Sequence, residues 1–326
     1  MRQRLGRSGL IVSTIGLGTM NFGSQLEERE AHRIADAAFD LGITLFDTAE
    51  MYPSPPSPET YGLSERILGK WLSTKQRDGV IVATKIVGPA DGLYQTGAHV
   101  RCGQSSLDRF HIGRAIDGSL ARLQTDYIDL LQFHWPDRVV PWEEQLEAVG
   151  RAIEQGKIRC FGCSNETPWG LMRAVATSER FGLPRPVSVQ NVLNLLEFDE
   201  YLRLKEVCTE EGIGYIAYSP LAMGLLSGKY RGADLPEGSR FARWSRYRDR
   251  YLSGTNLSAL EMLSAVARRH DVSLPELAYW WCLTMPAVNV VLTSASSPAQ
   301  LAVVSRAMQL ASEAAAPDIP GAETAA

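Results

Sequence analysis

The sequence predicts an α/β protein that folds as a single closed (β/α)8 barrel, or TIM barrel. Three observations support this prediction. Short apolar runs, interpreted as strands, alternate with longer amphipathic stretches, interpreted as helices, and this alternation is typical of parallel strands joined by right-handed crossovers. The apolar runs number eight, which favours a closed barrel over an open sheet. The length of 326 residues also suits one barrel domain.

The predicted elements follow one another along most of the chain. The predicted strands are Ile15–Leu17, Thr44–Asp47, Val80–Thr84, Ile128–Phe133, Ile158–Ser164, Val187–Gln190, Gly214–Tyr218 and Asn289–Leu292. The predicted helices are Glu27–Leu41, Ser64–Trp71, Ile112–Leu123, Trp142–Gln155, Pro168–Arg180, Glu200–Glu211, Leu257–Arg268 and Pro275–Leu283. The predicted helices begin and end with the expected residues, because Pro168 and Pro275 lie near helix starts while Gly42 and Gly156 follow helix ends.

The segments outside this alternation complete the predicted domain organisation. Met1–Ser13 contains a Gly-Arg-Ser-Gly turn and predicts an N-terminal β-hairpin that closes the barrel bottom. A long loop is expected between the seventh and eighth strands, with a basic and aromatic stretch over Tyr230–Tyr251. The barrel domain is predicted to span residues 1–310, and residues 311–326, rich in Ala, Glu and Pro, are expected to form a disordered tail.

Composition excludes several classes of protein. With 33 Lys and Arg against 37 Asp and Glu, the net charge of −4 argues against nucleic-acid and membrane-surface partners. No apolar run is long enough to cross a bilayer, and no secretory signal is visible, so a cytoplasmic protein is expected. The five cysteines are too few and scattered for a disulfide scaffold. Cys160 and Cys163 lie three apart in one predicted strand and point to opposite faces, so neither a redox pair nor a metal site is expected.

Two glycine-rich segments resemble nucleotide-binding motifs only superficially. Gly16–Asn21 begins like a dinucleotide fingerprint, but Asn21 stands where the third glycine is required. Gly224–Tyr230 resembles a phosphate-binding loop with one residue too few between its glycines, and Tyr230 replaces the hydroxyl residue that binds magnesium. Both motifs are rejected, although the backbone of the second remains a candidate for phosphate contacts.

Side chains suited to acid–base chemistry follow the predicted ends of three strands. Asp47 ends the second strand and Tyr52 follows it, while Lys85 follows the third strand and His134 the fourth. Because active sites of this fold lie at the carboxyl ends of the strands, the four residues are expected on one rim. Lys85 would favour the phenolate of Tyr52 and lower its pKa, Asp47 would hold Lys85, and His134 would orient a substrate oxygen.

Three of the four residues also have an ordinary structural interpretation. Lys85 suits a solvated charge, Asp47 a loop cap, and His134 a rim histidine. The hypothesis of a catalytic site therefore depends on all four sharing one face of the barrel.

The residues at these strand ends resemble the catalytic signature of the aldo-keto reductases. The signature lies in Phe46–Tyr52, Ala83–Lys85 and Gln132–Pro136. The resemblance covers Leu5 to about Leu310, and its further motifs are Gly16–Met20, Leu123–Asp129, Gly156–Arg159, Ser164–Glu166 and Ala217–Leu221. Met51–Thr60 is most similar to the bacterial Tas-like, NADP(H)-dependent branch of this superfamily.

The resemblance implies a (β/α)8 barrel that uses NADPH, without metal, to reduce an aldehyde or ketone. It implies that Tyr52 is the general acid, that Lys85 and Asp47 tune it, and that His134 orients the carbonyl. Hydride would pass from the nicotinamide to the carbonyl carbon. The implied cofactor contacts are Ser164, Asn165 and Gln190 at the nicotinamide amide, Tyr218 stacked on the ring, and Ser219, Leu221, Gly224, Ser227 and Lys229 along the pyrophosphate.

The chain departs from the family pattern near the adenosine end of the expected site. Ser294, which is expected to contact the cofactor, stands where Gly is usual, and Val303 and Val304 stand where an acid and Asn are usual. Ser296, Ser297 and Gln300 remain as 2′-phosphate contacts, without an arginine among them, so NAD(H) stays open beside NADP(H). The long loop carries four arginines, and two interpretations of them are equally supported. Either they supply the cation for the 2′-phosphate, or they form a solvated basic surface. The arginines are Arg240, Arg243, Arg246 and Arg248.

Fewer residues are predicted to contact the substrate than the cofactor. Met20, Phe22 and Trp135 are predicted to contact the substrate beside Tyr52 and His134, or else to serve as rim packing. The loop Asp137–Pro141 is short, which would leave the pocket mouth open to a bulkier substrate.

Three functions remain open from the sequence. The first is an NADP(H)-dependent reductase of a small-molecule carbonyl compound. The second is a nicotinamide-assisted epimerase or dehydratase of a sugar or secondary metabolite. The third is a cofactor-binding regulatory module without catalysis. The sequence is compatible with a monomer or a homo-oligomer.

Overall fold

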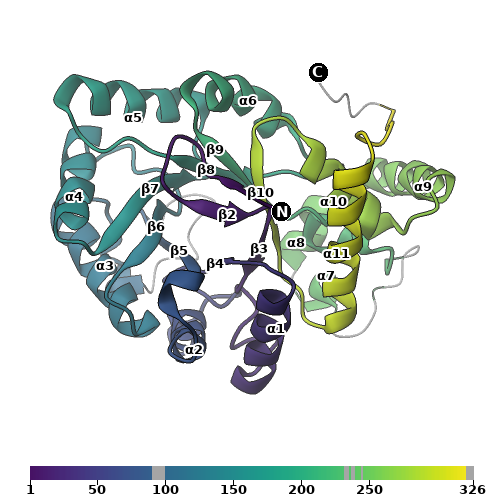
Figure 1. The fold of residues 1–326 in the computed structure, drawn as a ribbon, viewed down its shortest axis with the longest axis horizontal. Helices are drawn as coiled ribbons and strands as arrows, with labels where there is room; N and C mark the ends of the chain where they lie inside the picture. Colours follow the sequence, from purple (N-terminus) through teal and green to yellow (C-terminus); the bar gives the residue numbers. More distant parts are fainter. Residues whose placement is uncertain (90–99, 231–234, 236–238, 244, 321–326) are drawn as a thin grey trace.

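The computed structural model describes residues 1–89, 100–230, 235, 239–243 and 245–320. Within this part of the chain, eight parallel strands close into a barrel in the order β10-β3-β4-β5-β6-β7-β8-β9. The strands are β3 (Ile15–Gly18), β4 (Leu45–Asp47), β5 (Ile81–Ile86), β6 (Ile128–Phe133), β7 (Ile158–Ser164), β8 (Ser188–Val192), β9 (Gly214–Tyr218) and β10 (Val288–Thr293). The predicted (β/α)8 barrel is confirmed, and Figure 1 shows its strands enclosed by helices.

The apolar runs form strands because a closed parallel barrel buries both of their faces. Every residue of β5 and β6 is buried. Residues such as Leu45, Ala83 and Leu130 form an inner core, while neighbours such as Phe46, Val82 and Leu131 pack outward against the helices. This alternation fixes which side chains of a strand can reach the barrel interior.

The predicted N-terminal hairpin is also confirmed. β1 (Arg2–Arg4) pairs antiparallel with β2 (Ile11–Ser13). Leu5, Leu10 and Val12 join the inner core at the end of the barrel opposite the strand termini that carry the predicted site. The hairpin therefore closes the bottom of the barrel, and β2 crosses its middle in the view of Figure 1.

Helices cover the outside of the barrel. The predicted helices correspond within a few residues to α1 (Glu28–Asp40), α2 (Leu63–Leu72), α3 (Arg109–Leu123), α4 (Trp142–Glu154), α5 (Pro168–Phe181), α6 (Asp199–Glu211), α9 (Gly254–Arg269) and α10 (Leu274–Thr284). Side-chain caps begin several of them: Asp108 accepts from two backbone N–H groups of α3, and Ser273 with Glu276 forms a capping box on α10.

The connection from β9 to β10 is longer than a standard βα unit, as predicted. It contains the 3₁₀ segment Ala222–Ser227 and the short helices α7 (Arg240–Arg243) and α8 (Ser245–Tyr251) before α9 and α10. Arg248 is exposed and pairs with Asp249. The side chains of Arg240, Arg243 and Arg246 lie outside the described part of the structure.

The C-terminal region contains a helix that the sequence pattern does not indicate. α11 (Pro298–Glu313) begins at the Ser297 cap and packs against α10 and the core through Leu301, Val304 and Ala307. The helix continues three residues beyond the predicted domain boundary at 310, and Ile319 is also buried in the core. Residues 321–326 of the predicted tail lie outside the described residues.

Candidate active site

A cavity of about 1250 Å³ opens at the carboxyl ends of the barrel strands. Its lining includes the last residues of several strands, among them Gly18, Asp47, Ser164 and Tyr218. This is the rim on which the sequence predicts an acid–base site. Asp47, Tyr52 and His134 line the cavity directly.

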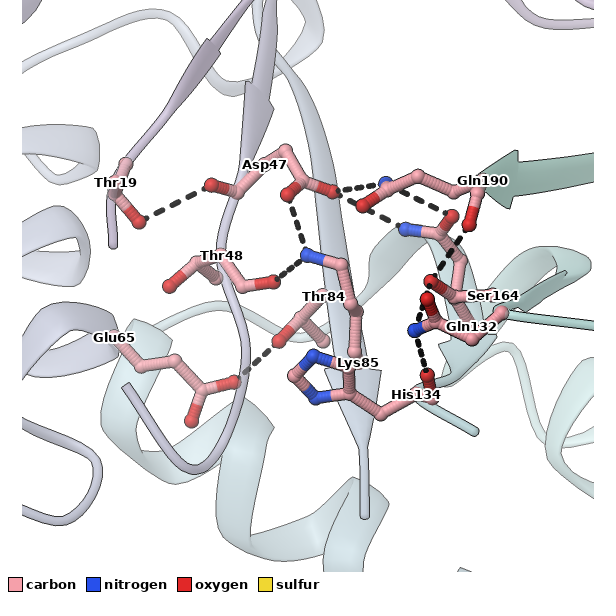
Figure 2. A network of polar contacts seen from close by, with 11 residues as sticks. Thr19, Asp47, Thr48, Glu65, Thr84, Lys85, Gln132, His134, Ser164 and Gln190 are labelled. Atoms are coloured by element: carbon pink, nitrogen blue, oxygen red, sulfur yellow. Dashed lines mark hydrogen bonds and ion pairs between the residues drawn. The ribbon is translucent and has the colours of Figure 1, made fainter. Parts of the chain in front are cut away.

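Asp47 and Lys85 form a buried ion pair beneath the cavity. The Lys85 ammonium donates to Asp47 Oδ1 at 2.5 Å and to the Thr48 carbonyl at 2.8 Å (Figure 2). Lys85 lies inside β5, one residue before its end, and its side chain is 1% exposed, so it is not the solvated charge of the ordinary interpretation. Burial lowers the pKa of Lys85, while the Asp47 carboxylate opposes that shift.

Tyr52 and His134 lie next to this pair. The Lys85 Nζ atom is 5.1 Å from the centre of the Tyr52 ring, and the Tyr52 and His134 ring centres are 5.6 Å apart. Burial, reinforced by the Lys85 charge, holds the pKa of His134 well below 6.5, so its imidazole is neutral at neutral pH. His134 Nδ1 is buried without a hydrogen-bond partner in the described part of the protein.

Two glutamines complete the polar network around Asp47, as Figure 2 shows. Gln190 Nε2 donates to Asp47 Oδ2 at 2.8 Å, and Gln132 Nε2 donates to the same oxygen at 3.2 Å. Gln190 Nε2 also donates to Gln132 Oε1 at 3.1 Å. Sequence reasoning missed Gln132, although a glutamine two residues before His134 in a buried strand was a signal, since both then face the barrel interior.

The other residues predicted at the nicotinamide amide lie together beside Gln190. Ser164 Oγ donates to the Gln190 carbonyl at 2.8 Å, and Asn165 Nδ2 donates to the His134 carbonyl at 2.8 Å. The Tyr218 hydroxyl donates to Asn165 Oδ1 at 2.7 Å. The structure thus brings together a serine, two amides and an aromatic ring along one cavity wall.

The residues predicted along the pyrophosphate also line the cavity. They are Ser219, Leu221, Gly224, Ser227 and Lys229. Gly224 has φ of +105° in the 3₁₀ segment, a backbone conformation that favours glycine. Among the described residues Lys229 pairs with no carboxylate, and its ammonium lies 5.1 Å from the Tyr230 ring centre. Lys229 therefore brings a cation to this part of the cavity.

The predicted adenosine contacts lie at the start of α11. Ser294, Ser296 and Gln300 line the cavity, and Gln300 Oε1 accepts from the Ser296 backbone N–H at 2.8 Å. Ser297 instead caps the helix by accepting from the Gln300 N–H. Val303 lines the cavity, whereas Val304 is buried in the core. Serine and glutamine side chains therefore share this wall with Val303.

The predicted substrate contacts do not all border the cavity. Phe22 is fully buried in the hydrophobic core and does not belong to the described cavity lining, so its contact with the substrate stays a prediction beside the alternative of packing. Met20 and Trp135 do line the cavity. The Trp135 indole donates to the Pro89 carbonyl at 2.6 Å and its ring centre lies 5.0 Å from that of His134.

A buried glutamate supports the loop that carries Tyr52. Glu50 donates its backbone N–H to the Lys85 carbonyl at 2.9 Å, and its side chain accepts from the Val87 N–H at 2.5 Å. The Arg101 guanidinium forms an ion pair with the same carboxylate. Burial raises the pKa of Glu50, and Arg101 opposes that shift. Glu50 therefore joins the Tyr52 loop to the end of β5.

The described residues offer no candidate for two other kinds of site. Among them, no group of three or more His, Cys, Asp and Glu side chains is placed to hold a metal ion. No helix in the described part of the chain is long and apolar enough to cross a membrane.

Comparison with known proteins decides the family. The model of the Aldo/keto reductase family matches residues 14–316, which is most of the chain. The chain belongs to the aldo/keto reductase family. The family match spans every barrel strand and the polar network around Asp47.

Individual aldo/keto reductase relatives cover the chain almost from end to end. Protein tas of Escherichia coli and that of Shigella flexneri are each 39% identical over 316 residues, covering 91% of this chain and 90% of the relative. An uncharacterized oxidoreductase of Bacillus subtilis, YrpG, is 34% identical over 308 residues, covering 94% and 90%. These relationships identify the chain as an oxidoreductase of this family.

Proposed function

We propose that this oxidoreductase is an NADP(H)-dependent carbonyl reductase in which Tyr52 protonates the oxygen of an aldehyde or ketone. The observation that carries the proposal is the convergence of Tyr52, Lys85 and His134 at one end of a single cavity. A phenol, a buried ammonium and a neutral imidazole form a set that can hold a carbonyl oxygen and deliver a proton to it.

The cavity wall fits a nicotinamide dinucleotide. Gln190 and Asn165 supply amide groups that match a carboxamide, and Tyr218 supplies an aromatic face for the ring. Lys229 supplies a cation for a phosphate group. When bound, the cofactor supplies the hydride. The choice of NADP(H) over NAD(H) is part of the proposal, in which Ser296 and Gln300 of the cavity lining are the candidate contacts of a 2′-phosphate.

The residues of the chain supply the proton chemistry. The Lys85 charge favours the phenolate of Tyr52, so it lowers the cost of releasing the phenolic proton to the substrate. Asp47 holds the Lys85 ammonium in place by the 2.5 Å contact. Neutral His134 donates from a ring N–H to the substrate oxygen without competing as an acid. Residues Met20 and Trp135 border the space for the rest of the substrate.

The test is oxidation of NADPH in the presence of a panel of aldehydes and ketones. Tyr52→Phe removes the proton donor and keeps the ring, so kcat is expected to fall roughly 100- to 10,000-fold. The matched control is Tyr201→Phe, which removes a buried hydroxyl bonded to the Pro286 carbonyl, away from the cavity. The proposal is wrong if Tyr52→Phe retains the activity of the control. Product formation without net NADPH oxidation would instead indicate epimerisation or dehydration.

A further inference from the structure

We propose that Gln132 is a positioning residue that fixes the side-chain amide of Gln190 so that its oxygen faces the nicotinamide carboxamide. The proposal rests on the proposed function, because it assumes a nicotinamide cofactor. Gln132 is fully buried in β6, and it contacts both Asp47 and Gln190.

The chemistry of Asp47 dictates how the two amides are turned. An ionised carboxylate only accepts hydrogen bonds, so the groups that approach Asp47 Oδ2 must be the amide nitrogens of Gln190 and Gln132. With this assignment neither amide oxygen is the atom that contacts Asp47 Oδ2. The orientation therefore follows from the charge of one neighbouring residue.

Gln132 uses its remaining oxygen to fix Gln190 a second time. Gln190 Nε2 has two hydrogens, and it donates one to Asp47 Oδ2 at 2.8 Å and the other to Gln132 Oε1 at 3.1 Å. Both donors of Gln190 are therefore satisfied inside the barrel. Its Oε1 has no hydrogen-bond partner among the described residues, and Gln190 lines the cavity.

The unused oxygen of Gln190 is an acceptor, and this determines what it recognises. A nicotinamide carboxamide carries an NH2 group, which is the complementary donor. Turning the Gln190 amide by half a rotation would place its oxygen against both Asp47 and Gln132 Oε1, and would present a donor to the cavity. Gln132 thus makes the turned orientation of the Gln190 amide less favourable in free energy. Two acceptors, Asp47 Oδ2 and Gln132 Oε1, would face the misplaced oxygen instead of one.

The experiment separates the nicotinamide half of the cofactor from the rest. Binding of NADPH and of 2′-phospho-ADP-ribose, which is NADP lacking the nicotinamide, is measured by tryptophan fluorescence for wild type and Gln132→Met. Methionine keeps the length and removes both polar groups. NADPH is expected to bind roughly 3- to 10-fold more weakly to this variant, the equivalent of one lost hydrogen bond, while the nicotinamide-free probe binds unchanged.

Two further variants make the result specific. Gln145→Met is the matched control: Gln145 is also a buried glutamine, whose Nε2 donates to the carbonyls of Asp137 and Val140, and its loss should change neither affinity. Gln132→Glu keeps an acceptor for Gln190 Nε2. The ratio of the two affinities should therefore stay within about twofold of wild type, even where repulsion between the introduced carboxylate and Asp47 reduces stability.

The proposal is overturned if Gln132→Met weakens both probes equally, as a purely structural role would, or weakens neither. It is also overturned if Gln132→Glu loses the selective affinity for NADPH as fully as Gln132→Met does. Failure of the proposed function gives a different result, because it appears in the wild-type protein itself, either as no binding of NADPH or the nicotinamide-free probe or as NADPH binding without reduction of any carbonyl compound in the panel.

Discussion

Removal of the Lys85 charge has a calculable effect on the pKa of Tyr52. Lys85→Met keeps the length of the side chain and deletes an ammonium that lies 5.1 Å from the centre of the Tyr52 ring. With the phenolate charge placed at the ring centre and an effective dielectric constant of about 20, the two unit charges interact by about 3 kcal/mol. That energy corresponds to about 2 pH units in the pKa of the phenol.

The sign of the effect follows from which form of Tyr52 the cation favours. The ammonium stabilises the phenolate, so the pKa of Tyr52 is expected to rise when Lys85 is removed. Carbonyl reduction needs the protonated phenol, and kcat therefore falls as the pH rises through this pKa. In Lys85→Met, the pH at which kcat falls should move about 2 pH units upward; this is the falling limb of the profile of kcat against pH. At pH 7, kcat should decrease because the phenol is a weaker acid.

The assay is the pH dependence of kcat for reduction at saturating NADPH. Because Lys85→Met leaves Asp47 buried without its cation, a loss of about 3–5 kcal/mol of stability is expected. The double variant Asp47→Asn, Lys85→Met removes both charges and avoids the unpaired carboxylate; its limb should also move upward, but by less than about 2 pH units, because the opposing charge of Asp47 is lost as well. The electrostatic reasoning is refuted if the limb stays within about 0.5 pH unit of its wild-type position in both variants.

Two other predictions concern single side chains of the site. His134 should show no titration between pH 6 and 8 by NMR, since burial and Lys85 hold its pKa well below 6.5; a titration near 6.5 would contradict this. Because the unfolded chain binds a proton there and the folded one does not, His134 reduces stability below pH 6.5 by about 1.4 kcal/mol per pH unit, and His134→Gln should remove that slope from urea unfolding. Phe22→Ala should lower the free energy of unfolding by about 3–5 kcal/mol and leave KM for the carbonyl substrate unchanged, whereas Met20→Ala should change KM. Equal effects on KM would show that Phe22 contacts the substrate after all.

The fold could be predicted from the sequence because a closed parallel barrel leaves a strong pattern. Strands such as Ile128–Phe133 are buried on both faces and appear as continuous apolar runs, and their predicted bounds match the structure. α11 (Pro298–Glu313) was harder to predict, because its buried side is formed by few large residues and its sequence is rich in alanine and polar residues. When the apolar stripe of a helix is weak, its position depends on the neighbouring element, here α10, more than on the local sequence.

The candidate site was predictable to the extent that its residues lie at strand ends. Asp47 and His134 end or follow strands, so topology alone places them on one rim. Gln132 was missed because a glutamine acquires its role from Asp47 and Gln190, which lie on other strands. The burial of Phe22 could not be predicted, because proximity in sequence to Met20 does not determine which side of the loop a side chain occupies.

The ion pair between Glu50 and Arg101 bears on how uniform the reaction rate is from one molecule to the next. The interaction between Lys85 and Tyr52 weakens by about 0.5 kcal/mol for each ångström of added separation near 5 Å, so an unsteady distance would spread the acidity of the phenol over a range of values. Glu50 holds the Tyr52 loop to the Lys85 carbonyl and to Val87, and Arg101 neutralises its charge. Glu50 therefore links the Tyr52 loop to the strand that carries Lys85. If Tyr52 is the proposed acid, a population of such molecules should react as a single kinetic species, with each turnover starting from the same acidity.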